Sequence, residues 1–475
     1  TPTTMRTLPL LSIFLLFQGA VFGQDSQNSS GTRLTLAEAQ SLAATRAYSV
    51  RYASFDTQEA ASNSREIIAS GFPQVSGSIE YNRYIDIPTQ VSSGDVFGFP
   101  DYLTAFLGGV AQATGVPLDA PPADPNAIQE FQFGATQTMT AGITATQLIF
   151  SPSYFVGIQA AKAYASAMEA SESKSVADAR QAAGEGYAAA LAAQENVAIL
   201  KAAEALAAEA LGQTRALVAE GLAESTDADQ LELALSEMTQ QRATAESMAS
   251  VALDALKFTV GMPVKTTVIL ADSFESLSNA FTGAAVLGTP FDAMRLPGIQ
   301  SQSKNLELSE LGIRNEKAAG MPSIGAFYTN QRNAQRDAFD FFGEGSWYPI
   351  QLVGVQMNIP IWSSFGGKEK VLQAQLTRDR AATALEQVTE AATLEYRAAR
   401  SEYNSSLEQR LQAQRGLDLA ERILDRTRIR FQEGVASSFD MTQAQNQLVS
   451  AQANHAQATL RWFNAHLRLE RSLNA

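Results

Sequence analysis

The sequence predicts a mostly helical protein that is built twice from one plan. In each copy a helix leads into a pair of strands, then a very long helix, a tight turn and a last helix. Three observations predict this class: two matching sets of residues, two long segments without proline, and short segments whose apolar residues recur at every second position. The copies align on Pro73 with Pro322 and, further along, on Gly221 with Gly434. An internal repeat of this kind restricts the architecture before any residue chemistry is considered.

The ends and the composition of the chain exclude several classes of protein. Residues 1–23 have the basic start, the apolar core and the small-residue cleavage pattern of a signal peptide, which indicates export. The absence of cysteine excludes a disulfide scaffold, thiol chemistry and a lipid anchor on cysteine. The rest of the chain has no apolar run long enough for a membrane-spanning helix. A net charge of −14 argues against nucleic acid as a partner.

The first copy, residues 24–260, opens with a helix predicted over 35–70. Gly71 and Pro73 stop this helix, and we expect the glycine to take the left-handed conformation common at helix ends. Strands follow at about 74–84 and 131–150. Pro73 and Pro322 are 249 residues apart, whereas Gly221 and Gly434 are 213 apart, so the first copy holds 249 − 213 = 36 extra residues. A proline-rich segment between the two strands, 85–130, accounts for them. We expect it to be a long external loop.

The long helices come next. Residues 153–220 and 226–260 are predicted as helices in the first copy, and a mixed connector over 261–297 joins it to the second copy, 298–475. That copy is predicted to hold strands at about 323–332 and 348–362, followed by helices over 365–433 and 440–473. Each of the two longest helices would span about 100 Å, more than a globular domain needs.

The predicted strands carry apolar residues on one face and Thr, Ser, Gln or Asn on the other. In residues 74–84, Val75, Ile79 and Tyr81 alternate with Ser76, Ser78 and Glu80. Such strands fit a membrane barrel with lipid outside and water inside. They also fit an ordinary half-buried sheet of a soluble protein, and the pattern of a single strand does not separate these alternatives. Four strands cannot close a barrel by themselves, so a barrel would need several chains.

The tight turns have a local structural explanation. Gly221 and Gly434 end one helix, Ser225 and Ser438 are expected to cap the next, and Asp227 and Asp440 in the first turn complement the helix dipole. The sequence shows no nucleophile with a base, no phosphate-binding loop and no metal-ligand spacing. We therefore predict no enzyme, no catalytic residue, no cofactor and no metal site.

Several stretches of the chain resemble TolC-like outer-membrane efflux proteins. They are Leu34-Thr-Leu36-Ala-Glu38-Ala39, the two helix stops, the stretch from Val353 to Gly367, and Arg430-Phe431-Gln-Glu433-Gly434-Val-Ala-Ser-Ser438-Phe-Asp440 with the residues that follow. The resemblance covers essentially the whole mature chain and occurs in both copies. It implies a homotrimer in the outer membrane of a Gram-negative cell, in which each chain gives four strands to a twelve-stranded barrel above a periplasmic helical tunnel.

The resemblance also implies a function and site residues. The protein would be a passive exit duct that takes small molecules or proteins from an inner-membrane pump through a periplasmic adaptor. Its partners would also include outer-membrane lipid. Gly221, Ser225, Asp227, Gly434 and Ser438 would form the tips that face the adaptor. An acidic ring at the second tip maps onto Asp440, and its companion position is Gln443 here. The family's Asn-Pro in the first copy is replaced by Ala47-Tyr48.

Two other classes remain as alternatives. An exported structural coiled-coil protein that bridges envelope layers would show sustained heptads and would not need two pairs of amphipathic strands. A periplasmic adaptor normally has one helical hairpin with small β-domains, not a duplicated plan.

Overall fold

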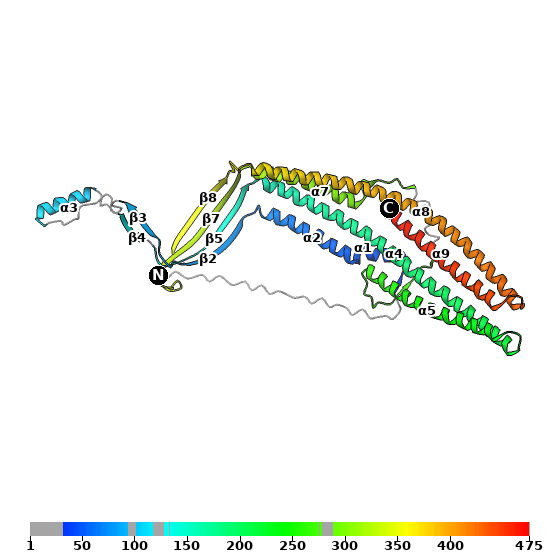
Figure 1. Ribbon diagram of the computed structural model, residues 1–475. Helices are drawn as coiled ribbons and strands as arrows, with labels where there is room; N and C mark the ends of the chain where they lie inside the picture. The colour runs from blue at the N-terminus through cyan, green and yellow to red at the C-terminus, as the bar shows by residue number, and fades with distance from the viewer. Residues whose placement is uncertain are drawn as a thin grey trace, which may run out of the picture. The chain divides into compact units, whose positions relative to one another are not determined.

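The computed structural model describes residues 32–93, 101–116, 128–132, 134–274, 276–277 and 288–474 (Figure 1). The expected signal peptide at 1–23 lies outside these residues, as do parts of the segment 85–130 and of the connector 261–297. Among the described helices, none combines the length and the apolar composition that crossing a membrane requires.

The chain divides into two compact units, and each unit draws on both sequence repeats. The strand unit comprises residues 47–181, 284–405 and 465–475, and the turn unit comprises residues up to 46, 182–283 and 406–464. The repeats seen in the sequence are therefore not the compact units of the structure.

The strand unit contains an antiparallel sheet of four strands in the order β2-β5-β7-β8. The strands are β2 Gln74–Arg83, β5 Gln137–Phe150, β7 Ser323–Arg336 and β8 Tyr348–Asn358. All four strands were predicted, with differences at their ends: β5 begins later than 131, β7 runs on past 332, and β8 ends well before 362. Pro360 and the positive φ angles of Ser364 and Phe365 prevent regular strand geometry beyond β8.

The register of the sheet separates its two faces. Tyr81, Met139 and Ala334 lie in one row on the first face, and Val75, Ile143 and Val353 occupy the same face further along. On the opposite face Asn333 donates a hydrogen bond of 2.8 Å to Thr140, and the hydroxyls of Thr144 and Thr329 lie 3.4 Å apart. At its far end this face is covered by Phe341, which packs on Met139 and Ala334. The rest of the apolar face is uncovered, because Val75, Ile79 and Val353 remain 69%, 78% and 77% exposed.

The segment 85–130, expected to be a loop, contains regular structure in the residues described. A second, two-stranded sheet pairs β3 Thr89–Ser93 with β4 Ile128–Gln132, and helix α3 Asp101–Thr114 lies between them in the sequence. Phe106 on α3 is 64% exposed.

Four helices of the strand unit are connected to the same end of the sheet (Figure 1). They are α2 Tyr48–Ala69, α7 Pro297–Ala319, and the first parts of α4 Pro152–Ala219 and α8 Gly366–Gln432, with a short 3₁₀ helix η2 Ala293–Arg295 ahead of α7. The ends of α4 and α8 agree with prediction to within about two residues, because neither contains a proline after its first turn.

The glycines at the helix-to-strand junctions are not left-handed, so that expectation was wrong. Gly320 has φ −81° at the end of α7, and Gly71 is not among the residues with positive φ. Gly71 is instead required by packing, because a β-carbon there would collide with the ring of Tyr154. The Tyr154 hydroxyl donates 3.0 Å to the Ile68 carbonyl, which ties the start of α4 to the end of α2.

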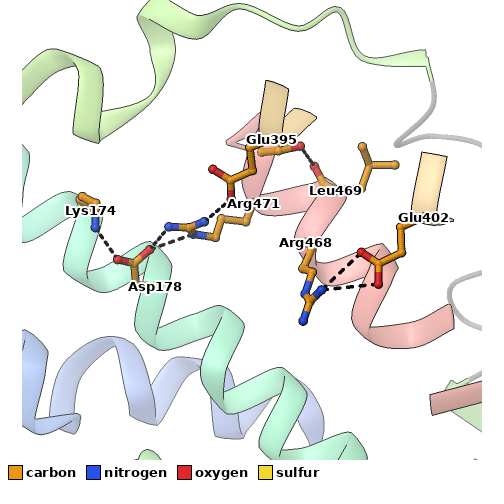
Figure 2. Close-up of polar contacts among 8 residues, drawn as sticks. Lys174, Asp178, Glu395, Glu402, Arg468, Leu469 and Arg471 are labelled. Atoms are coloured by element: carbon orange, nitrogen blue, oxygen red, sulfur yellow. Dashed lines mark hydrogen bonds and ion pairs between the residues drawn. The ribbon is translucent and has the colours of Figure 1, made fainter. Parts of the chain in front are cut away.

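An ion-pair network joins α4, α8 and the last residues of α9 Ser438–Leu473 in the strand unit (Figure 2). Two nitrogens of Arg471 contact Asp178 at 2.8 and 2.6 Å, and a third lies 2.8 Å from Glu395. Lys174 adds a contact of 2.8 Å to Asp178. Burial alone would raise the pKa of Asp178, but the hydrogen bonds from Lys174 and Arg471 lower it below its ordinary value.

In the turn unit, two very short strands join segments far apart in the sequence. β1 Thr32–Leu34 pairs in parallel with β6 Val268–Leu270. The buried Tyr187 of α4 donates to the Leu34 carbonyl and lies 2.9 Å from Asp272 Oδ2, which also accepts from the Leu36 amide. This pairing was not predicted.

The helix predicted over 35–70 is in fact two helices. α1 is Leu36–Arg46, and α2 begins at Tyr48. Ala47 between them has an extended backbone, with φ −55° and ψ 140°, and occupies the N-cap position of α2. The interruption lies at the position where the resembling family has Asn-Pro, although this chain has neither residue there. It also coincides with the border between the two units.

Candidate functional site: the paired helical turns

Two tight turns of the turn unit hold the residues singled out in the sequence. The first turn connects α4 to α5 Ser225–Thr259, and the second connects α8 to α9. Gly221 and Gly434 each have φ +73°, as predicted for the residue after a helix end. The following amides, those of Leu222 and Val435, donate back to carbonyls five residues earlier at 2.8 Å. Both turns are therefore the same helix-ending motif.

The next helices begin differently in the two turns, and here the expected caps were wrong. Glu224 occupies the N-cap position of α5 without a side-chain capping bond, so Ser225 is not the cap. At the second turn the cap is Ser437 rather than Ser438: its hydroxyl lies 3.2 Å from the Asp440 amide. Asp440 accepts in return from the Ser437 amide at 3.0 Å and hydroxyl at 2.8 Å. This reciprocal pair is a capping box with a carboxylate.

The electrostatic state of Asp440 follows from that box. The hydrogen bond from the Ser437 amide, then that from its hydroxyl, holds the pKa of Asp440 below its ordinary value, and the charge of Arg430 contributes. Asp440 is exposed and carries its negative charge at neutral pH. Gln443, three residues on, is also exposed and lies on the same side of α9.

The two turns are linked to each other. Ser438, which is only 5% exposed, donates a hydrogen bond of 2.5 Å to Asp227 in the first turn of α5. Arg428 of α8 lies 2.9 Å from Glu209 of α4, so a second polar contact joins the same two hairpins. The structure therefore brings Ser438 and Asp227 together, whereas Asp440 and Gln443 take no part in this link.

Apolar side chains pack the helices behind each turn. Leu231 of α5, fully buried, contacts Ala210 and Leu211 of α4. Met441 and Ala444 of α9 pack on Leu424 of α8, with Leu206 of α4 against the same cluster. Each turn thus has its own apolar cluster behind it, and α4 contributes to both clusters.

Three exposed apolar residues of the turns were missed in the sequence. Leu222 is 75% exposed, Val435 is 65% exposed and Phe439 is 66% exposed. Their positions directly beside Gly221, Gly434 and Asp440 could have indicated them, because a hydrophobic residue in a tight, otherwise polar turn has no core to enter.

A groove between α5 and α9 lies further along the two helices, because its first α5 residue, Glu237, is twelve residues after the start of α5. It has a volume of about 570 Å³ and is lined mainly by polar residues of α5 with Val449, Ser450 and Ala453 of α9. Met248 of α5, at its edge, is 63% exposed.

Comparisons with known proteins give the following similarities. Residues 294–475 match the family described as Outer membrane efflux protein. No curated protein sequence matches the chain. Among solved structures, the chain is similar to the CmeC outer membrane channel of Campylobacter jejuni, with a TM-score of 0.66 and 17% identity over 92% of this chain and 85% of that one.

Two further solved structures are similar to the chain with somewhat lower TM-scores. The outer membrane protein VceC of Vibrio cholerae gives a TM-score of 0.63 and 14% identity over 93% of this chain and 96% of that one. The open-state MtrE outer membrane channel of Neisseria gonorrhoeae gives a TM-score of 0.59 and 15% identity over 93% of this chain and 89% of that one. These likenesses show the fold, and they cover the first repeat as well as the second.

Proposed function

We propose that this protein is the outer-membrane exit duct of an efflux or secretion machine. The match of residues 294–475 to the outer membrane efflux protein family and the fold that the described chain shares with solved channels support this proposal. Proteins of this family are channels and not enzymes. The duct is passive: it opens a path for cargo, and an inner-membrane pump supplies the energy.

The observation that carries this proposal is the four-stranded sheet. Within the described part of the chain, its outer strands β2 and β8 have no neighbour on one side, and most of its apolar face is uncovered. Unpaired strand edges recruit further strands, and an exposed apolar face of this size needs an apolar environment. Three copies joined from β8 to β2 would satisfy both requirements as one twelve-stranded barrel in lipid. Channels of this family are homotrimers, which supports that number.

The orientation follows from the same sheet. The apolar face would meet outer-membrane lipid, and the face with Thr140, Thr144 and Asn333 would line the water-filled passage. The helices would extend into the periplasm. The extra segment 85–130, inserted between β2 and β5 at the end opposite the helices, would lie outside the cell.

The helical turns provide the contact with partners in this proposal. Leu222 and Val435 place exposed apolar side chains on the tips, and such residues mark surfaces that bind other proteins. A periplasmic adaptor that bridges to the pump would cover them, and contact with the groove beside Met248 and Val449 would require it to reach further along α5 and α9. Asp440, with one carboxylate per chain and Gln443 beside it, would form the narrowest charged ring of the duct.

The rival reading, an exported structural coiled-coil protein, is disfavoured by the sheet. Its helices alone would suffice for bridging, and it would have no use for strands with an uncovered apolar face.

The decisive experiment is extraction of the mature protein from membranes. We expect it to require detergent, to run at three times the mass of one mature chain, and to conduct ions in planar bilayers as the trimer. A water-soluble, well-folded monomer purified without detergent would overturn the proposed function.

A further inference from the structure

The charged residues of the four-stranded sheet are sorted by face. The four strands β2, β5, β7 and β8 contain four charged side chains, namely Glu80, Arg83, Arg332 and Arg336. The register places all three arginines on the apolar face with Tyr81 and Met139, whereas Glu80 lies on the polar face. A chain with a net charge of −14 thus shows only positive charge on the strand residues of its apolar face.

The arginines lie at one end of that face. Arg332 stands nine positions beyond Ser323 on β7. At ~3.4 Å per residue and a strand tilt of about 40°, this is a rise of roughly 23 Å. The apolar band of membrane barrels is about 25 Å tall. If the band begins at the helix-proximal end of the sheet, Arg332 lies at its far border, where apolar tails give way to headgroups.

Aromatic side chains surround this border. The segment after β7 folds back over the apolar face, so that Phe341 is buried against Met139 and Ala334 with Trp347 beside them. Tyr81 contacts the rings of Phe339 and Phe341 edge to face, with centroids 5.3 and 5.8 Å apart. Aromatic girdles of this kind mark the interfaces of membrane barrels.

Two of the arginines differ in how they are held. Arg336 is fixed by Asp340 at 3.3 Å and by the Ser346 carbonyl at 3.0 Å. Arg332 is exposed, and its neighbours on the same face are Pro349 across the strand pair and the exposed pair Asn330 and Gln351 one row away. An exposed guanidinium next to two amide side chains can bind an oxyanion with several hydrogen bonds.

We propose that Arg332, with Asn330 and Gln351, binds the phosphate headgroup of a lipid in the outer leaflet. The proposal rests on the proposed function, since that function turns the apolar face toward lipid. The acyl chains of this lipid lie along Tyr328, Val353 and Val355 on the same face, and the phosphate reaches the guanidinium at the border. Arg83 extends the basic rim on β2.

A lipid fits this surface better than a protein or a free anion. The patch is continuous with the apolar face below it, so an occupant needs a long apolar part joined to one anionic group. A free phosphate would use only the guanidinium and the amides. A protein ligand would leave the apolar strip below the rim without a specific partner.

The test uses the mature trimer in neutral detergent with Arg332→Gln, and Arg314→Gln as a matched control, because Arg314 is an exposed arginine of α7 outside the sheet. Phosphatidic acid and diacylglycerol with the same acyl chains are titrated, and bound copies are counted by native mass spectrometry. We expect the parent and Arg314→Gln to prefer phosphatidic acid, and Arg332→Gln to bind it about tenfold more weakly, the size of one charge-assisted contact. Arg332→Lys should keep part of the preference.

Several results would overturn the inference. One is equal affinity of the parent and Arg332→Gln for phosphatidic acid, which would leave the rim to a protein partner. Another is displacement of the lipid by inorganic phosphate at equal concentration, which would identify a site for the anion alone. Either result with a conducting trimer would leave the proposed function intact, whereas a soluble monomer would remove the basis of both.

Discussion

Ser438 at the start of α9 donates a hydrogen bond of 2.5 Å to Asp227 at the start of α5, and so joins two turns that lie 211 residues apart in the sequence. In the repeat, Asp227 and Asp440 are equivalent positions, yet their carboxylates do different things. Asp227 accepts from the other hairpin, whereas Asp440 accepts from Ser437 of its own turn. Two copies of one motif thus have two functions: the first copy provides the link between the hairpins, and the second leaves its charge facing solvent.

The first prediction concerns ion selectivity. Asp440→Asn should lower the preference of the channel for cations and weaken its block by divalent cations, because three symmetry-related carboxylates would lose their charge. Asn keeps a side-chain oxygen that can accept the hydrogen bonds from Ser437, so the trimer should stay folded. Asp227→Asn is the matched control and should change selectivity much less. If single-channel recordings show the same change in cation selectivity for both variants, or no change for either, Asp440 does not form the charged ring.

The second prediction concerns the link between the turns. Ser438→Ala removes the donor to Asp227 at a buried position, at a cost of about 1–2 kcal/mol. If the link holds the tips in the state described, the channel should open roughly tenfold more often in bilayer recordings. Ser437→Ala weakens the cap of α9 without touching Asp227, so it serves as the control. An identical rise for both variants would mean that a loosened helix start, and not the link, opens the duct.

The third prediction concerns acid. The pKa of Asp440 is depressed by its bonds to Ser437, so its capping contribution is complete above the ordinary value near 3.8 and is lost as the pH falls through the lower folded value. Pepsin should therefore cleave the second turn more readily at pH 2 than at pH 4. Asp440→Asn lacks this titration and corrects for the pH dependence of pepsin itself. The same pH ratio in both proteins would contradict the prediction.

The fourth prediction compares two arginines of α9, Arg471 and Arg468, which Figure 2 shows with their different acidic partners. Arg471 is 29% exposed and contacts both Asp178 and Glu395, so Arg471→Gln should destabilise the protein by about 1–3 kcal/mol. Arg468 is 51% exposed and meets Glu402 at 3.3 Å, so Arg468→Gln should cost under about 1 kcal/mol. Thermal unfolding of the detergent-solubilised protein measures both. A larger loss for Arg468→Gln would refute the ranking.

The fifth prediction concerns the segment 85–130. Its replacement by a loop about as long as residues 337–347, which connect β7 to β8, should leave the trimer intact and raise the conductance. The conductance should rise because this segment, which the second copy lacks, would lie at the barrel mouth and narrow it. A label placed on Phe106→Cys should react from outside intact cells, since the chain has no other cysteine. Reaction from the periplasmic side alone would refute the placement.

Sequence reasoning succeeded where a local pattern determines structure. The absence of proline predicted the long helices α4 and α8, and the period-two pattern predicted β2, β5 and β8. The alternation is less clean in residues 323–331, so β7 was predicted mainly from its place in the repeat. Sequence reasoning failed where contacts between residues far apart in the sequence determine the structure. The break at Ala47 has no local breaker, and β1 and β6 are too short for a period to appear.

The turns show the same division on a smaller scale. Gly221 and Gly434 were correctly placed, because a left-handed helix end favours glycine strongly. Of the two adjacent serines 437 and 438, the sequence could not decide which begins the helix, and that choice determines which one is free to reach Asp227. The link between the turns depends on two hairpins coming together, which no local pattern reports.

The parallel pairing of β1 with β6 has a consequence for the order of events during export. The bond from the Leu36 amide to Asp272 spans 236 residues and closes the first repeat into a loop before any of the second repeat is needed. A chain that emerges from its N-terminus can therefore secure its first half while the rest is still in transit. The edge of β5 that β7 will occupy then stays open until the second repeat arrives, and that interval is when the unfinished chain is most exposed to pairing with the wrong strand.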